Sequence, residues 1–268
     1  MKKRLYLFFA IAHIFLFLGS GARGADTIFT VQNRSSTPNF QLFLNLGTDG
    51  SIAMSGTLFT LHGIYGMAFL NDTLYAVELE NGTGDDYLAT IPHEDRFGEG
   101  SRVAGGANPV GFSNVEGLAV ADGIIYATSL DFVGHKTSLL TIDPVTGIGT
   151  LVGTGTFDVL IVGLAYDPVS GVLYGAGINT ATFNPQLYTI NRTTGATSPV
   201  GLLGVHIEGL AWDSVLGLIG AFEKLYQSNP QTGAATQVGT EDFTDGRPGT
   251  FNGLYGLAAF VASTPDPP

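Results

Sequence analysis

Short runs of alternating apolar and polar residues, separated by turn residues, fill the chain beyond its N-terminal segment. Within this pattern a five-residue phrase returns five times, with Gly second, Leu or Met third and Ala fourth, and an aliphatic residue always precedes it. Self-similarity at a fixed spacing is the signature of a repeat architecture. The five copies are 65–69, 116–120, 162–166, 208–212 and 255–259, and their glycines are 46 to 51 residues apart.

Each complete repeat continues with three further strand-like segments. In the second repeat these are 125–128, 139–143 and 149–152. The turn Asp143-Pro144-Val145-Thr146-Gly147 precedes the last of them. In such a turn Asp opens the reversal, Pro pre-sets the backbone and Gly supplies a positive φ at the exit. Four short strands joined by hairpins, and repeated at this spacing, predict the blades of a β-propeller.

The repeats begin and end out of phase. A fifth first strand is predicted at 256–261, and the N-terminal region supplies a second, third and fourth strand at 27–31, 41–44 and 51–54. We therefore expect the two ends to build one shared blade, which hides sheet edges that would otherwise pair with other chains. The predicted fold is all-β, a five-bladed β-propeller of four-stranded blades closed by that shared blade. It spans residues 25–262, and residues 263–268 are expected to form a disordered tail.

The N-terminal segment has the pattern of a secretory signal peptide. Lys2, Lys3 and Arg4 precede an apolar run, 5–18, and small residues follow before Ala25. The run is too short to favour a permanent membrane span. We expect residues 1–24 to be removed from a secreted protein, extracellular or periplasmic, with no transmembrane span left. An uncleaved N-terminal anchor is the alternative.

Charge and composition limit the classes of partner. The formal net charge of the 268 residues is −12, and the loss of the four basic residues in 1–24 takes it to −16. Such an acidic surface repels nucleic acid and anionic lipid, and it tolerates cations. The absence of cysteine excludes thiol catalysis and Cys-based zinc sites. We expect a monomer with an unidentified protein or glycan partner and no nucleic acid.

Two phrases of the repeats support a family resemblance. The sequence Leu-Tyr-Thr-Ile-Asn at 187–191 and the turn at 143–147 resemble those of secreted bacterial β-propeller repeat proteins of unassigned function. The resemblance covers most of the mature chain, and it implies a fold rather than a chemistry. Many of those proteins carry a C-terminal Pro-Glu-Pro sorting signal. Here the segment 265–268 reads Pro-Asp-Pro-Pro, with no apolar helix or basic cluster after it.

The first residue of the repeated phrase changes from copy to copy. It reads Tyr65, Glu116, Val162, Glu208 and Tyr255. Strict alternation would place the preceding aliphatic residue, the Gly and the Ala on one sheet face, and the variable residue with Leu or Met on the other. Gly and Ala on the packed face would let neighbouring blades approach closely near the axis. If the phrase is the innermost strand, the variable residues form a ring around a channel mouth.

Two interpretations of this ring remain open. His206 and Asn114 each lie two residues before a ring glutamate, so both should point the same way as that glutamate. Carboxylates together with backbone carbonyls suit Ca²⁺, which takes six to eight oxygen ligands. The predicted site has Glu116 and Glu208 as metal ligands, with Tyr65, Asn114, His206 and Tyr255 as further ligand-binding residues. In the alternative, the glutamates are solvated residues at a wet channel mouth and no cofactor binds.

The Glu-Gly-Leu-Ala phrase is also similar to strand starts in metal-dependent lactonase-like and phytase-like propellers. In those families a Glu at such a position can be a metal ligand, which implies this role for Glu116 and Glu208 only. The sequence contains neither a Gly-x-Ser-x-Gly nor a His-Glu-x-x-His motif. We therefore predict a non-enzymatic binding scaffold with its site at the channel mouth. The alternative is a Ca²⁺-dependent hydrolase of lactonase or phosphatase type.

Overall fold

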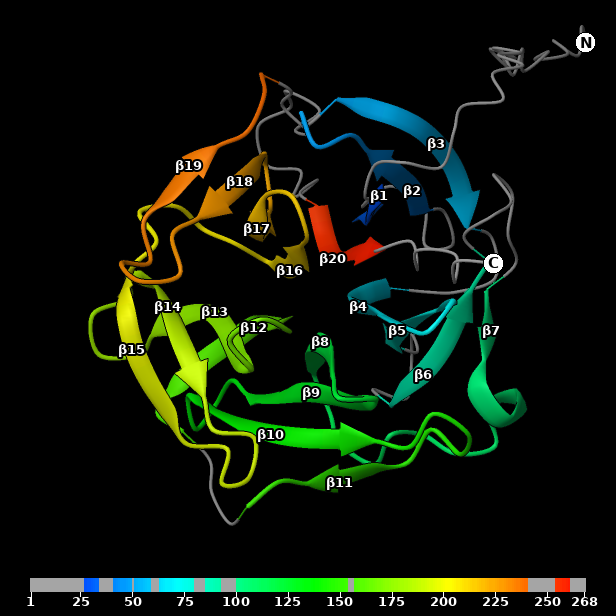
Figure 1. Cartoon of the computed structure of the whole chain (residues 1–268). Coiled ribbons are helices and arrows are strands. Elements are labelled where there is room, and N and C mark those ends of the chain that lie inside the picture. The colour runs from blue at the N-terminus through cyan, green and yellow to red at the C-terminus, as the bar shows by residue number, and fades with distance from the viewer. Residues whose placement is uncertain are drawn as a thin grey trace, which may run out of the picture.

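The structure covers most of the predicted repeat region. A computed structural model describes residues 27–33, 41–49, 51–58, 63–79, 85–92, 100–153, 157–240 and 254–260. These residues form strands, turns and one short 3₁₀ helix, η1 (Val103–Gly106). The strands pair into five antiparallel four-stranded sheets arranged around a central axis (Figure 1). The predicted all-β propeller of four-stranded blades is therefore confirmed at this level.

The sheets follow one another along the chain, except that the last strand joins the first sheet. Sheet 1 contains β20 (Leu254–Phe260), β1 (Thr27–Asn33), β2 (Gln41–Leu46) and β3 (Ile52–Leu58). Sheet 2 contains β4 (Gly63–Leu70), β5 (Thr73–Leu79), β6 (Asp86–Ile91) and β7 (Ser101–Arg102). Sheet 3 contains β8 (Val115–Ala121), β9 (Ile124–Asp131), β10 (Lys136–Ile142) and β11 (Gly149–Leu151). Sheet 4 contains β12 (Val159–Asp167), β13 (Val172–Asn179), β14 (Pro185–Ile190) and β15 (Thr197–Leu202). Sheet 5 contains β16 (Gly209–Asp213), β17 (Gly217–Ala221), β18 (Leu225–Ser228) and β19 (Ala235–Gln237).

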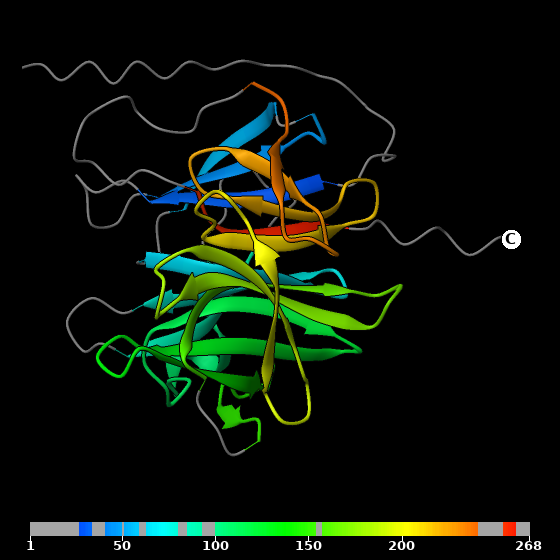
Figure 2. The ribbon, with the colours of Figure 1, turned by 90° about the vertical axis from the view of Figure 1, so that its left-hand side faces the viewer.

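Sheet 1 joins segments from opposite ends of the sequence. β20 pairs with β1, with Ile28 opposite Ala259, and Figure 2 shows β20 in red beside β1 in blue. The buried hydroxyl of Thr30 donates a hydrogen bond to the carbonyl of Gly256, with an O···O distance of 2.9 Å. This is the pairing that the incomplete first and last repeats predicted. The predicted signal peptide and the tail at 263–268 lie outside the described residues.

The inner strands β4, β8, β12, β16 and β20 approach one another closely at the repeated glycines. A Cβ atom added to Gly163 would lie 2.9 Å from the backbone nitrogen of Leu210 in sheet 5. One added to Gly209 would lie 3.0 Å from that of Leu257 in sheet 1. A Cβ atom added to Gly66, Gly117 or Gly256 would likewise come too close to the inner strand of sheet 3, sheet 4 or sheet 2, respectively. The constant glycine therefore permits the close strand packing near the axis that the sequence predicted.

A β-bulge in the inner strands changes the alternation of faces that the sequence predicted. In β8, Val115 lies opposite Ser129 and Leu118 opposite Ala127, so Glu116 and Gly117 share one place in the ladder. The extra residue brings Val115 and Leu118 into the same core cluster, whereas Ala119 packs in the next one. The predicted grouping of the aliphatic residue with Ala is therefore wrong, because a bulge shifts the alternation by one residue. The ladders of β4, β12 and β20 are interrupted at the same Gly-containing site.

The core lies between adjacent sheets rather than in one central cluster. Phe29, Ile64, Met67 and Leu74, for example, pack between sheets 1 and 2. Each large apolar side chain buried in this way stabilises the fold by about 1.5–3 kcal/mol relative to exposure. No helix in the described part of the chain is long and apolar enough to cross a membrane.

Candidate functional site

The variable residues of the repeated phrase gather at one end of the channel. Tyr65, Glu116, Val162 and Glu208 line a narrow hollow, together with the repeated glycines, and it leaves no room for a water molecule. The first three lie at the bulges of β4, β8 and β12, and Glu208 directly precedes β16. The structure therefore brings four of the five predicted ring residues together. Tyr255 lies in β20 next to this ring, and its side chain is outside the described part of the structure.

Glu116 has the strongly perturbed carboxyl group of this mouth. Burial raises its pKa to about 8, and the charges of Glu208 and Asp86 add to the effect. Burial also raises the pKa of the Tyr65 phenol, with Glu116, Asp86 and Glu208 contributing in the same direction. The acidic groups are therefore close enough to repel one another, and burial together with this repulsion favours the protonated form of Glu116.

His206 and Glu208 form a close pair beside this hollow. The distance from His206 Nε2 to Glu208 Oε1 is 2.5 Å. This hydrogen bond raises the pKa of His206, although partial burial of the ring opposes the shift. The imidazole packs edge-on against Phe222, with ring centroids 4.9 Å apart. The predicted neighbours His206 and Glu208 are thus in contact, and a protonated His206 compensates one carboxylate of the mouth.

Asp86 acts on this site through its charge, although the sequence did not indicate it. It is buried in β6 of sheet 2, and its Oδ2 accepts a hydrogen bond from the backbone N–H of Val115 at 2.7 Å. Burial raises the pKa of Asp86 to about 6, whereas the hydrogen bond from Val115 lowers it. The sequence signal was the pair Asp85-Asp86 before a predicted strand. Nothing in that pair indicated contact with the following repeat.

Asn114 has a local structural role at the start of β8. Its backbone adopts a φ of 52°, a left-handed conformation that Asn tolerates. Its side-chain nitrogen donates to the carbonyl of Leu130 at 3.1 Å, and the Leu130 N–H donates to the Asn114 carbonyl at 3.0 Å. These bonds join the ends of β8 and β9. The predicted ligand role of Asn114 stays a prediction, and its side-chain nitrogen is already used in the fold.

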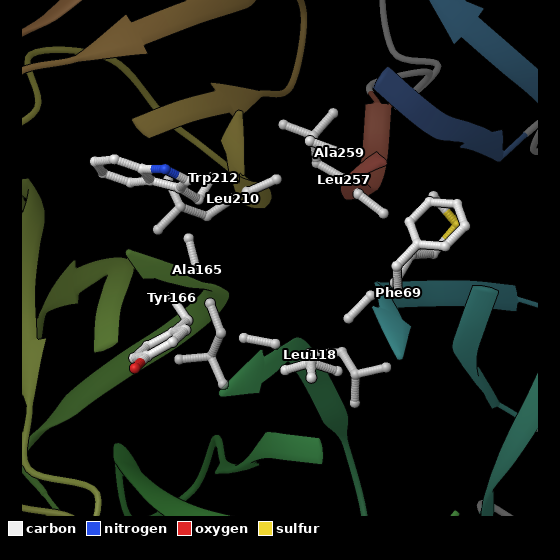
Figure 3. A pocket seen from close by; sticks show the side chains of 15 residues that line it. Phe69, Leu118, Ala165, Tyr166, Leu210, Trp212, Leu257 and Ala259 are labelled. Carbon is white, nitrogen blue, oxygen red and sulfur yellow. The ribbon is translucent and has the colours of Figure 1, made fainter. Parts of the chain in front are cut away.

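An apolar layer separates the two ends of the channel. One side chain from each inner strand lines both the polar hollow and a second hollow of about 90 Å³ at the opposite end. These side chains are Met67, Leu118, Leu164, Leu210 and Leu257. Figure 3 shows the second hollow, where Leu and Ala side chains surround the axis and Phe69, Tyr166 and Trp212 lie farther out. A polar ligand held by Glu116 would therefore stop at this layer rather than cross the channel.

The polar mouth offers a partial ligand set for a metal ion. Within the described residues, no group of three or more His, Asp or Glu side chains is arranged to hold a metal. Glu116 and Glu208 together have four carboxylate oxygens, whereas Ca²⁺ takes six to eight oxygen ligands. Asp86 already uses one oxygen on Val115. A cation at this mouth would therefore need backbone carbonyls and water to complete its shell.

Comparison with known proteins identifies the fold. No protein-family model matches the sequence, and no curated protein matches it. Among solved structures, TolB from Acinetobacter baumannii matches with a TM-score of 0.52 and 14% identity, over 88% of this chain. The chain spans 66% of that TolB chain. At this identity the likeness shows the β-propeller fold alone.

Two further solved structures are more distant. A luciferin-regenerating enzyme matches with a TM-score of 0.47 and 9% identity, over 81% of this chain and 78% of its own. A gluconolactonase from Xanthomonas campestris matches with a TM-score of 0.42 and 14% identity, over 81% of this chain and 87% of its own.

Proposed function

We propose that this chain is a secreted, non-enzymatic binding scaffold, a five-bladed β-propeller closed by sheet 1, with a ligand site at the polar channel mouth. The observation that carries the proposal is the relation of Glu116 to Glu208. These carboxyl groups come from different sheets and line one hollow, where burial raises the pKa of Glu116 and the charge of Glu208 raises it further. A cation, or a positively charged group of a larger ligand, would relieve this repulsion.

The hollow has no room for a water molecule among its lining side chains. A cation, or the ammonium group of a larger partner, would therefore bind at the outer edge of the mouth, or after Glu116 and Glu208 have moved apart. The formal net charge of −12 also favours a cationic ligand through long-range attraction.

The second candidate is a Ca²⁺-dependent hydrolase in which Glu116 and Glu208 hold the metal. The clustering of these carboxyl groups with Asp86 favours it, because a divalent cation would stabilise their ionised forms. The partial ligand set at the mouth is the reason we favour the scaffold. A bound Ca²⁺ would supply Lewis-acid chemistry for hydrolysis.

Thermal unfolding of the mature chain tests the cation site. We expect calcium chloride or methylammonium chloride to raise the Tm of the wild type above its value in EGTA. Neither salt should change the Tm of a Glu116→Gln/Glu208→Gln variant. Asp158→Asn, which alters an exposed carboxylate, is the matched control and should respond as the wild type does. A wild-type Tm that is the same in all three solutions would make the cation site wrong.

Turnover assays separate the two candidates. Lactone, phosphoester and glycoside substrates should remain unchanged when they are incubated with the protein and added calcium. Calcium-dependent turnover that disappears in a Glu208→Gln variant would replace the scaffold by the hydrolase.

A further inference from the structure

A separate hollow lies outside the channel, between sheets 3 and 4. Its volume is about 780 Å³, within the range of roughly 300–1,000 Å³ that small-molecule sites occupy. Its lining includes the buried side chains Tyr126 of β9, Leu173 of β13 and Ile190 of β14. Arg192 and Thr193, from the turn after β14, add polar groups. Thr189, Asn191 and Ser198 also line the hollow, so it is more polar than most small-molecule sites.

Arg192 is held in place by contacts that cross from sheet 4 to sheet 3. Its Nη1 donates to Oδ2 of Asp122, in the turn after β8, at 2.6 Å. The guanidinium carbon lies 4.9 Å from the ring centre of Tyr166, whose hydroxyl donates to Oδ1 of Asp122 at 3.1 Å. A guanidinium fixed in this way loses less conformational entropy when it binds a ligand.

The charge balance of Arg192 indicates the kind of ligand. Its side chain has five N–H donors, and within the described residues one hydrogen bond, to Asp122, is formed. The remaining donors are directional, but Asp122 already balances their charge. The formal net charge of −12 also repels anions. The ion pair with Asp122 therefore weakens the usual preference of arginine for ligand carboxylates and phosphates, and its remaining donors can bind neutral hydroxyl groups.

The other lining groups suit the same ligand. The hydroxyls of Tyr126 and Thr193 can donate and accept hydrogen bonds, as the hydroxyls of a sugar can. Val172 and Ala196, which are not buried, offer apolar surface for the C–H groups of a sugar ring. We propose that the hollow between sheets 3 and 4 binds a neutral oligosaccharide, with Arg192 as its principal hydrogen-bond donor. This site is separate from the channel mouth and does not depend on the cation proposal.

The other repeats indicate a substitution that should remove the Arg192 side chain and preserve the turn. The residue that corresponds to Arg192 is Pro144 in the turn 143–147 and Pro230 in the turn 229–233. The turn at Asn191 uses the N–H groups of Thr193 and Thr194, which donate to the Asn191 side chain. Arg192→Pro should therefore keep the turn, because Pro favours this position, and remove the guanidinium. Lys136→Ala, at the start of β10, removes another partly exposed cation as a control.

Saturation-transfer NMR and calorimetry with maltotriose, cellotriose, N,N′,N″-triacetylchitotriose and trigalacturonate test the proposal. At least one neutral trisaccharide should bind, and Arg192→Pro should weaken that binding by about tenfold or more, as expected for the loss of hydrogen bonds from a charged donor. Lys136→Ala and Glu116→Gln/Glu208→Gln should bind it as the wild type does. A circular dichroism spectrum and a Tm matching the wild type would establish that Arg192→Pro is folded.

Three outcomes would overturn the proposal. The first is that none of the three neutral trisaccharides binds. The second is tighter binding of trigalacturonate, which would show that the ligand is anionic. The third is unchanged affinity in folded Arg192→Pro, which would place the sugar elsewhere. None of these outcomes bears on the calcium and methylammonium experiment at the channel mouth.

Discussion

The carboxylate of Asp86 accepts a hydrogen bond from the backbone N–H of Val115 at 2.7 Å, across the boundary between sheets 2 and 3. Val115 directly precedes Glu116, so this bond anchors the strand that carries the most perturbed carboxyl group of the mouth. Burial raises the pKa of Asp86 to about 6 and that of Glu116 to about 8. Proton binding at this site is therefore linked to folding.

We expect the protein to be more stable at pH 5 than at pH 9. Unfolded carboxyl groups titrate near pH 4, so above that pH the folded state keeps protons that the unfolded state has lost. The resulting stability is complete below the unfolded pKa. It is lost as the pH rises through about 6 for Asp86 and about 8 for Glu116. Tm values measured by calorimetry from pH 5 to pH 9 should fall across this interval.

Glu116→Gln should weaken that pH dependence. Glutamine resembles the protonated carboxyl group, so the variant should match the wild type at pH 5 and have the higher Tm at pH 9. The exposed carboxylate of Asp158 provides the control, since Asp158→Asn should preserve the wild-type slope. If the Tm of Glu116→Gln falls as steeply as that of the wild type, Glu116 does not carry the linkage.

Gly163→Ala should destabilise the ring. The new Cβ would lie 2.9 Å from both the backbone nitrogen and the Cβ of Leu210, so β12 and β16 would have to separate. We expect a loss of about 1–3 kcal/mol in the free energy of unfolding, as for other overpacked sites. Urea denaturation measures this loss. Gly63→Ala is the matched control because, among the described residues, the nearest atoms to its Cβ would be those of the Tyr65 side chain. Equal losses in the two variants would contradict the packing argument.

Thr30→Val tests whether the two ends of the chain share sheet 1 in solution. The substitution keeps the shape of the side chain and removes the hydroxyl that donates to the Gly256 carbonyl. Leaving a buried carbonyl without this donor should cost about 1–3 kcal/mol. The midpoint of urea unfolding should therefore fall in Thr30→Val, whereas Thr150→Val, at an exposed position in β11, should change it little. An unchanged midpoint in Thr30→Val would argue against the β1–β20 pairing.

Ser170→Ala should expose a difference between two similar turns. In sheet 4, Asp167 accepts hydrogen bonds from the Val169 N–H at 2.8 Å and from the Ser170 hydroxyl at 2.5 Å. In sheet 5, Leu216 stands at the position of Ser170, and Asp213 Oδ2 has no hydrogen-bond partner among the described residues. Ser170→Ala would leave Asp167 in the same state, at a cost of about 1–3 kcal/mol.

Urea denaturation measures the effect of Ser170→Ala as well. Ser113→Ala, at an exposed loop position, is its control. A loss in Ser170→Ala no larger than that of the control would mean that this turn tolerates an unpaired buried carboxylate oxygen without measurable cost.

The repeats and the sharing of sheet 1 were predictable because their signals are local. Turns such as 143–147 mark strand ends through Asp, Pro and Gly, whose conformational preferences do not depend on distant residues. The position of Glu116 at the mouth followed from the repeat in the same way. An incomplete set of strands at each end was enough to predict that β20 would pair with β1.

The sequence did not indicate which side of the sheet each inner-strand side chain occupies, nor the role of Asp86. A bulge leaves no local mark, because Val115-Glu116-Gly117-Leu118 fits both a regular strand and a bulged one. Asp86 reaches Val115 only through the packing of sheet 2 against sheet 3, which depends on how the whole ring closes. Its burial and its raised pKa are consequences of that closure.

The bulge in the inner strands has a consequence for how such a protein changes over time. It assigns two tasks to two adjacent residues, since the glycine sets the distance to the next sheet and the residue before it faces the mouth. A substitution at 65, 116 or 162, which lie at the bulges, can therefore change one wall of the hollow while the adjacent glycine keeps its contact with the next sheet. The side chains of the mouth can therefore change while the strands that carry them keep their packing. New ligand preferences can then arise one sheet at a time, while the ring itself is inherited unchanged.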